Sequence, residues 1–148
     1  MKAQPRPILV VEDDPVDREM IELAFKRADI ENPVVTVSDG REALDYLEAV
    51  GRFSGRREQD LPAVIVLDLD MPLMGGHELL GLINAKPEFA LIPVVVLTTS
   101  QFDQDLIQSY TSGANSCITK PGDFEQLVEI ARAIGGYWCR INRMPERK

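Results

Sequence analysis

The apolar residues of this chain fall into short unbroken runs that alternate with longer stretches of helical periodicity. The short runs, rich in Val and Ile, predict strands at Ile8–Val11, Val34–Ser38, Ala63–Leu67, Val94–Thr98 and Ser116–Thr119. After each run, apolar residues recur every three or four positions, which predicts helices at Pro15–Ala28, Gly40–Val50, His77–Ala85, Asp103–Ser112 and Phe124–Ile141. Asp13 or Asp14 is the expected N-cap of the first helix.

The alternation of strands and helices predicts the fold class. The central run Ala63–Leu67 has no polar alternation, which is typical of a parallel strand covered on both faces. Right-handed crossovers then give an α/β protein with a doubly wound parallel sheet. The flavodoxin-like strand order 2-1-3-4-5 is the natural candidate, and it places the first and third strands side by side.

Size and composition limit the possible classes of protein. A length of 148 residues predicts a single domain over 1–148, with its core at about 7–138 and a basic tail at 140–148. The net charge of -8 argues against nucleic acid as a partner. Met1–Pro7 does not resemble a signal peptide, and no apolar run reaches membrane-spanning length. Cys117 and Cys139 are too few for a disulfide framework, so we expect a cytoplasmic protein.

Carboxylates follow two strands that the predicted order makes neighbours. Asp68 directly follows Ala63–Leu67, and Glu12-Asp13-Asp14 follows Ile8–Val11. Ligands of open α/β sheets bind at this carboxyl edge. Asp13 and Asp68 would repel each other there unless a cation lay between them.

Magnesium is the cation that suits such a site, because it takes oxygen ligands and retains several waters. Asp13, Asp68 and the backbone carbonyl of Asp70 are the candidate direct ligands, and Glu12 would act through a water. An alternative reading of Glu12-Asp13-Asp14 is a helix cap with acids favoured by the helix dipole.

Two further strand ends add groups that could hold a phosphoryl group on Asp68. Aspartate nucleophiles form acyl phosphates, and Lys120 would neutralise one phosphoryl oxygen while the Thr98 hydroxyl donates to another. Taken singly, Thr98 is an ordinary strand residue and Lys120 an ordinary surface lysine. Their placement at successive strand ends favours the functional reading.

The combined pattern resembles the receiver domain of two-component response regulators. The resemblance rests on Glu12-Asp13-Asp14, on Leu67–Pro72 with Gly75-Gly76, on Thr98 and on Lys120-Pro121, and it extends over about Pro7 to Trp138. It implies phosphorylation of Asp68 by a phosphohistidine donor and Mg²⁺ held by Asp13, Asp68 and the Asp70 carbonyl with help from Glu12. It also implies that Thr98 and Lys120 bind the phosphoryl group and that the Lys120-Pro121 peptide is cis.

A narrower resemblance connects the chain with stand-alone regulators that are paired with bacterial and cyanobacterial phytochromes. It rests on the Arg-rich segment Gly51–Pro62, on Leu97–Ser100, on Gly113–Ser116 and on Tyr137-Trp138. It implies a sensor histidine kinase of phytochrome type as the partner and no fused output domain.

Three positions of the sequence lie outside the predicted metal and phosphoryl ligands or extend their roles. Receivers usually carry Tyr or Phe three residues before the lysine, but this chain has Cys117, expected to be buried, so its output cannot depend on an aromatic ring at that place. Asp70 and Ser100 occupy the family positions that tune the lifetime of the phosphoryl group. His77 is expected to be exposed in the first turn of the third helix, with no role in the site.

The outer helices carry more apolar residues than one core-facing stripe needs. The last helix has a core stripe that includes Phe124 and Trp138, and a second stripe made of Ile130, Ala133, Tyr137 and Ile141. We expect this surplus to support a homodimer. The first helix has a similar surplus around Met20 and Leu23, on the helix that docks the kinase in receivers. The downstream protein target cannot be predicted.

Two other classes of protein compete with this interpretation. A phosphatase of the haloacid dehalogenase type also uses Asp-x-Asp after a strand, which Asp68-Leu69-Asp70 matches, but it needs an acidic pair after the lysine that this chain lacks. A flavin carrier of the same fold needs a Ser/Thr/Gly-rich loop after the first strand, where Glu12-Asp13-Asp14 would repel a phosphate.

Overall fold

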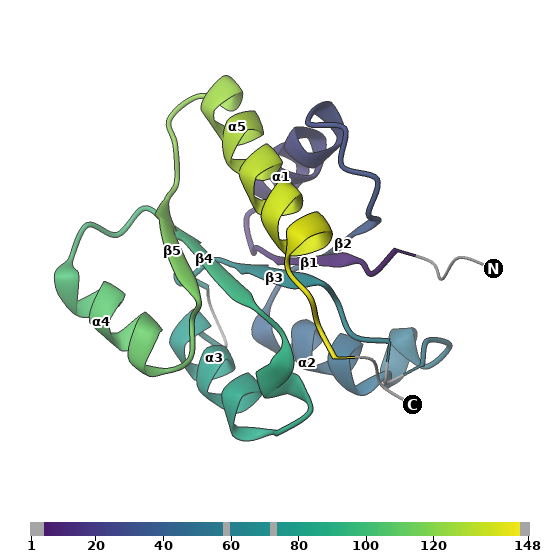
Figure 1. The fold of residues 1–148 in the computed structure, drawn as a ribbon. Coiled ribbons are helices and arrows are strands. Elements are labelled where there is room, and N and C mark those ends of the chain that lie inside the picture. Colours follow the sequence, from purple (N-terminus) through teal and green to yellow (C-terminus); the bar gives the residue numbers. More distant parts are fainter. Residues whose placement is uncertain (1–4, 58–59, 72–73, 146–148) are drawn as a thin grey trace.

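A computed structural model describes residues 5–57, 60–71 and 74–145. Its strands are β1 (Ile8–Val11), β2 (Val34–Val37), β3 (Val64–Leu67), β4 (Val94–Thr98) and β5 (Ser116–Thr119). Its α-helices are α1 (Pro15–Arg27), α2 (Gly40–Glu48), α3 (Gly76–Ala85), α4 (Asp103–Thr111) and α5 (Phe124–Ile134). Short 3₁₀ turns η1 (Gly51–Phe53) and η2 (Phe89–Leu91) and a π-helical segment η3 (Gly135–Ile141) complete the set of described elements (Figure 1).

All five described strands form one parallel sheet in the order β2-β1-β3-β4-β5, which confirms the predicted doubly wound fold. Strands β1 and β3 are neighbours, and every residue of both is buried. This complete burial explains why their sequences show no polar alternation. Strands β2 and β5 are the two edges.

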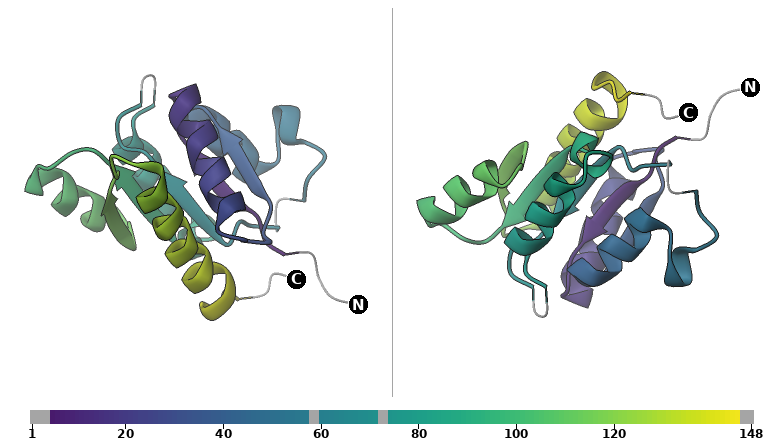
Figure 2. Two further views of the ribbon diagram at one scale, coloured as in Figure 1. Left: turned by 90° about the horizontal axis from the view of Figure 1, so that it is seen from above. Right: turned by 90° about the horizontal axis from the view of Figure 1, so that it is seen from below.

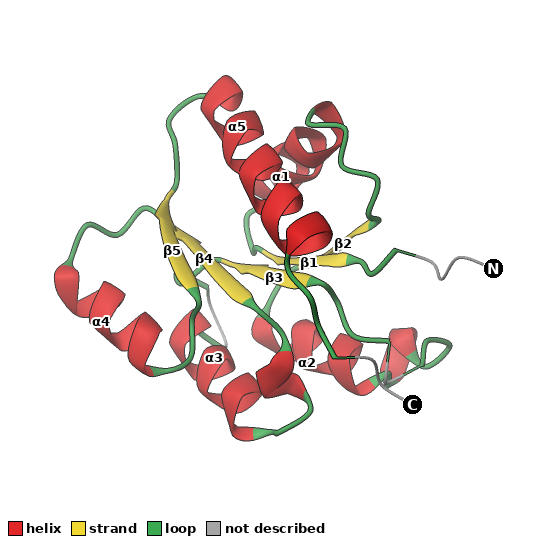
Figure 3. Ribbon diagram, in the orientation of Figure 1, coloured by secondary structure: helices red, strands yellow, loops and turns green. Residues whose placement is uncertain are grey.

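Helices cover both faces of the sheet, as Figure 3 shows by element type. Helices α1 and α5 lie on one face, and α2, α3 and α4 lie on the other, which the two opposite views of Figure 2 make plain. Alternate residues of each central strand therefore contribute to two separate clusters of buried side chains, for example Leu9 to one and Val10 to the other. The sheet is the rigid layer that fixes the loops at its carboxyl edge.

Most predicted boundaries hold to within two residues, but the last helix differs. It was predicted to run from Phe124 to Ile141, whereas α5 ends at Ile134 and η3 continues in π-helical form. Gly135 lies against Ile30, since a Cβ on it would approach the Ile30 side chain to 2.4 Å. None of the helices in the described part of the chain is long and apolar enough to cross a membrane.

Candidate functional site

The four predicted strand ends lie together at one edge of the sheet. In the strand register, Val11 is opposite Leu67, and Thr98 is opposite Thr119. Glu12, Asp68 and Lys120 each follow directly on one of these paired residues. The geometry thus brings together residues that are more than a hundred positions apart in the sequence.

Three carboxylates form the centre of this edge. Glu12, Asp13 and Asp68 each offer an oxygen, and the three oxygens lie within 4.8 Å of one another. Glu12 is 1% exposed and Asp68 is 6% exposed. The Asp70 N–H donates to Asp68 Oδ1 at 3.2 Å, which fixes the orientation of that carboxylate.

Burial and proximity change the acidity of these groups. Burial, the hydrogen bond with Asp68 and the Asp68 charge together raise the pKa of Glu12 to about 8. Burial also raises the pKa of Asp68, against the lowering effects of its hydrogen bond with Glu12 and of the Lys120 charge. Near neutral pH the two carboxylates therefore retain a shared proton unless a cation replaces it.

The donor set fits a divalent metal ion. All three side chains are hard oxygen ligands that converge on one point, and their mutual repulsion is relieved by a doubly charged ion. Glu12 contributes a carboxylate oxygen to this cluster. The side chain of Asp70 is exposed, in keeping with a role for its backbone carbonyl alone. Residue 72 of the predicted Asp70-Met71-Pro72 segment lies outside the described residues.

Lys120 balances the negative charge. Its Nζ lies 3.2 Å from Glu12 Oε1, 3.2 Å from Asp17 Oδ2 and 3.9 Å from Asp68 Oδ2. Burial alone lowers the pKa of Lys120, but the carboxylates of Asp68 and Glu12 outweigh burial and raise it. The ammonium group is therefore a fixed positive charge beside Asp68 at any physiological pH.

Thr98 completes the set of predicted residues. It is 2% exposed, and its carbonyl accepts the Lys120 backbone N–H at 2.8 Å. Its Oγ1 accepts the Ser100 N–H at 3.1 Å, which leaves the hydroxyl proton free to donate. Thr98 and Lys120 are thus held side by side at the ends of β4 and β5.

Two residues of the site were not found from the sequence. Asp17 pairs with Lys120, and the Arg18 guanidinium donates to the backbone carbonyls of Glu12 at 3.0 Å and Asp13 at 3.4 Å. Asp14 caps α1 by accepting the N–H groups of Val16 and Asp17, so the first turn of the helix faces the site. The spacing of Asp17, four residues after Asp13 and so about one helical turn on, was the feature of the sequence that could have placed Asp17 near the acidic cluster.

Two predictions about individual residues are wrong. No peptide bond between described residues is cis, so the Lys120-Pro121 bond is trans. The trans isomer is the intrinsically favoured one, and Lys120 reaches Glu12 from it. His77 is not exposed either: its side chain is 23% exposed, and its Nε2 lies 3.7 Å from Oδ1 of Asp105 in α4.

The structure also shows the surroundings of Cys117, at the position where receivers usually carry an aromatic residue. Cys117 is only partly buried, contrary to expectation, and burial raises the pKa of its thiol. Its backbone N–H donates to the hydroxyl oxygen of Tyr110 at 3.2 Å. An aromatic side chain from α4 therefore covers part of β5 from outside the sheet.

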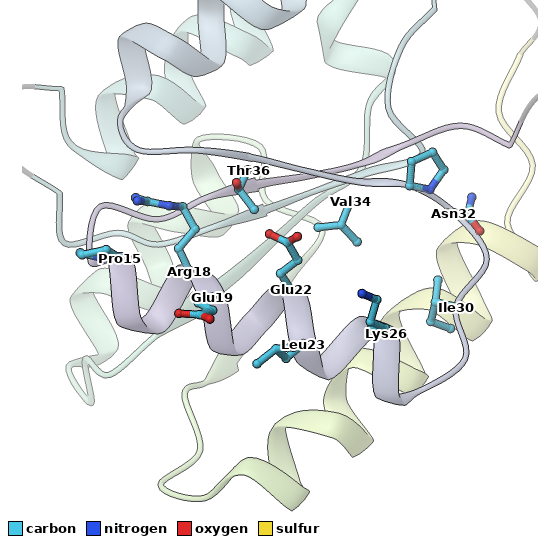
Figure 4. A pocket seen from close by; sticks show the side chains of 11 residues that line it. Pro15, Arg18, Glu19, Glu22, Leu23, Lys26, Ile30, Asn32, Val34 and Thr36 are labelled. Carbon is cyan, nitrogen blue, oxygen red and sulfur yellow. The ribbon is translucent and has the colours of Figure 1, made fainter.

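A pocket of about 600 Å³ lies away from the carboxylates, between α1 and the edge strand β2 (Figure 4). Arg18, Glu22 and Lys26 rise from α1 on one side, and Val34 and Thr36 face them from β2. Neither Asp68 nor Lys120 lines it. This pocket is therefore separate from the cluster of Glu12, Asp13 and Asp68.

Comparisons with known proteins agree with this geometry. Residues 8–132 match the response regulator receiver domain family. The chain is 39% identical over 138 residues to the probable methanogenesis regulatory protein FilR2 of Methanothrix harundinacea, covering 93% of this chain and 86% of that protein.

Two solved structures are similar along almost the whole chain. The Mn²⁺-bound form of response regulator Rcp1, a protein of Synechocystis sp., has a TM-score of 0.83 and 32% identity, covering 95% of this chain and 99% of that one. The phosphorylated cyanobacterial phytochrome response regulator RcpA has a TM-score of 0.86 and 35% identity, covering 97% and 100%.

Proposed function

Since this chain belongs to the response regulator receiver family, we propose that it is a phosphoacceptor of a two-component phosphorelay and that Asp68 receives the phosphoryl group from a histidine kinase. The observation that carries the assignment of Asp68 is its position. It is a nearly buried carboxylate at the end of β3, beside two further carboxylates and a lysine. The coverage of 99% and 100% of the two solved regulators supports a single receiver domain.

The proposed reaction is a transfer between two side chains. The bond between phosphorus and the kinase histidine nitrogen breaks as a bond between phosphorus and an Asp68 oxygen forms, and the imidazole leaves with a proton. Lys120, already 3.9 Å from Asp68 Oδ2, neutralises charge on the transferred oxygens. The Thr98 hydroxyl donates to another of these oxygens. The protein is thus a signalling substrate of the kinase rather than an enzyme with its own turnover.

Mg²⁺ is the proposed metal. Asp13 and Asp68, with the Asp70 carbonyl and the nearby Glu12, would hold it. When bound, it supplies positive charge that offsets the carboxylates and the incoming phosphoryl group. The acid cluster and the Mn²⁺-bound structure of Rcp1 support a divalent ion at this position.

We propose a phytochrome-type kinase as the partner, since RcpA, 35% identical to this chain, is a phytochrome response regulator. On α1, Leu23 is 43% exposed and Val16 is 66% exposed, so apolar side chains are available to a kinase beside the site. The proposal includes a cytoplasmic location, supported by two cysteines that are both free.

The proposed output is a changed set of protein contacts. The added phosphoryl charge draws Thr98 and Lys120 toward Asp68 and shifts the loops after β4 and β5 to a second arrangement. Homodimerisation through the last helical region is the proposed consequence. There, Tyr137 is 48% exposed and Ile141 is 69% exposed, which leaves part of the predicted second stripe open to a partner.

Intact-mass measurement with acetyl phosphate tests the assignment. We expect the wild-type chain to gain one phosphoryl group only when Mg²⁺ is present, and the adduct to survive acid but not base. Asp68→Asn should abolish the adduct, whereas Asp60→Asn, at an exposed carboxylate elsewhere, should retain it. Continuous release of phosphate from esters, with no adduct on Asp68, would instead favour a hydrolase and would contradict the proposal.

A further inference from the structure

His77 is the single histidine of the chain, and the proposed transfer does not use it. Its Nε2 lies 3.7 Å from Asp105 Oδ1, in the first turn of α4. Its Nδ1 is buried and has no hydrogen-bond partner among the described residues. A buried N–H without an acceptor is rarer and more costly than a buried lone pair, so the proton belongs on Nε2, facing Asp105.

A chain of contacts connects Asp105 to the phosphoryl-binding threonine. The other oxygen of Asp105, Oδ2, accepts the Ser100 hydroxyl, and Ser100 Oγ in turn accepts the Phe102 N–H at 3.3 Å. The Ser100 N–H donates to Thr98 Oγ1 at 3.1 Å. A displacement of Thr98 is therefore transmitted through Ser100 to Asp105.

His77, in contrast, is fixed to the segment that carries Asp68. The Gly76 N–H donates to the Leu69 carbonyl at 3.1 Å. Gly76 also lies so close to the residue that follows β3 that a Cβ on it would be 2.6 Å from the Asp68 carbonyl oxygen. The start of α3 is thus held against the backbone of Asp68 and Leu69, so a movement of the β4–α4 loop toward Asp68 would bring Asp105 toward His77.

We propose that His77 is a positioning residue that acts on Thr98 through Asp105 and Ser100. This inference rests on the proposed function, in which phosphorylation draws Thr98 toward Asp68. The present distance of 3.7 Å is too long for a direct hydrogen bond. A closure of less than about 1 Å brings Nε2 and the carboxylate into range. The new bond then holds the β4–α4 loop, and with it the Thr98 hydroxyl, against the phosphoryl group.

Beryllofluoride, a phosphoryl mimic that binds a carboxylate in the presence of Mg²⁺, tests this role in the full chain. The His77→Phe variant keeps an aromatic ring but has no hydrogen-bond donor. We expect it to weaken beryllofluoride binding about three- to tenfold, which corresponds to the free energy of one modest hydrogen bond. His77→Gln, whose amide NH₂ can replace Nε2–H, should restore binding to within about twofold. Glu78→Gln, at the exposed neighbouring position, is the matched control and should bind as the wild type does.

Because His77 is the only histidine, its imidazole signals in NMR spectra are assigned without ambiguity in an untagged chain. We expect a slowly exchanging Nε2 proton to appear when beryllofluoride and Mg²⁺ are added. A merely structural histidine would show the same signals before and after. This measurement on the wild type also decides the matter if a His77 variant does not fold.

Unchanged imidazole signals, or a folded His77→Phe chain that binds beryllofluoride as tightly as the wild type, would overturn the role of His77 and leave the proposed function intact. A wild-type chain that takes up neither beryllofluoride nor a phosphoryl group on Asp68 would overturn the proposed function itself. The two failures are therefore distinguishable.

Discussion

At the scale of single residues, the protonation of Glu12 in the acidic cluster makes the stability of the fold depend on pH. Glu12 is 1% exposed and lies beside Asp68, and its pKa is raised to about 8. A group whose pKa is higher in the folded state than in the unfolded chain stabilises the fold below its unfolded pKa. That contribution disappears as the pH rises through the folded value.

The metal-free protein should therefore lose stability between pH 5.5 and 8, with a slope of up to about 1.4 kcal/mol per pH unit from Glu12. Glu12→Gln should flatten this slope, leaving the part that Asp68 contributes in the same direction. Saturating Mg²⁺ should also flatten it, because the metal binds the deprotonated carboxylates. Urea unfolding at several pH values, with chelator or with Mg²⁺, measures each slope.

Glu42→Gln is the matched control. The hydrogen bond from Ser38 lowers the pKa of Glu42, so its contribution is fully present above its unfolded pKa and constant over this pH range. The slope of that variant should equal the wild-type slope. Equal slopes in wild type and Glu12→Gln would contradict the shared proton.

At the scale of elements, the start of α3 determines how closely that helix approaches the site. Gly76 contacts backbone atoms of the segment that follows β3, since a Cβ would lie 2.6 Å from the Asp68 carbonyl oxygen and 2.6 Å from Leu69 Cα. Backbone atoms cannot rotate away as a flexible side chain can. This close packing holds the N-terminus of α3 against the backbone of Asp68 and Leu69.

Gly76→Ala should accordingly lower the free energy of unfolding by about 1–3 kcal/mol, through overpacking against the segment that follows β3. Gly81→Ala, in the interior of the same helix with open space around it, should raise it by about 0.5–1 kcal/mol through helix propensity. Urea denaturation of both variants gives the comparison. If Gly76→Ala were as stable as the wild type, the close approach would be wrong.

The difference between strand ends and the contacts of helices explains which parts of the structure the sequence could predict. The strands followed from the apolar runs, and their order followed from the flavodoxin-like fold that the alternation of strands and helices suggests. Parallel strands end at one edge of a sheet, which is why Asp68 and Lys120 could be predicted to lie near each other. The contacts of Asp17, Arg18 and His77 depend on where each helix begins and how it is rotated against its neighbours. A hydrophobic pattern predicts the range of a helix and its core-facing side, but it does not predict which neighbouring element a polar side chain such as His77 contacts.

At the scale of the whole molecule, the two faces of the sheet differ in what they expose. The last helical region leaves Ile141 69% exposed beside Tyr137, whereas on the opposite face Leu82 of α3 is 44% exposed. If dimerisation is the output, substitution of a charge at these two positions should have unequal effects.

Ile141→Asp should reduce dimer formation at least tenfold when beryllofluoride and Mg²⁺ are bound, because an unpaired carboxylate would be buried in the interface. Leu82→Asp should dimerise as the wild type does. Light scattering after size-exclusion chromatography measures the mass of each variant. Loss of the dimer in Leu82→Asp alone would place the interface on the other face.

The hydroxyl of Tyr110 also affects whether another strand can pair with the edge strand β5. A sheet can add a strand from another chain where its edge strand presents unpaired N–H groups. Such edge pairing is the first step of many aggregation processes. On β5, the Cys117 N–H is already occupied by a side chain of the same molecule. At Cys117 the outer edge of β5 is therefore closed to pairing with another chain by Tyr110 of α4.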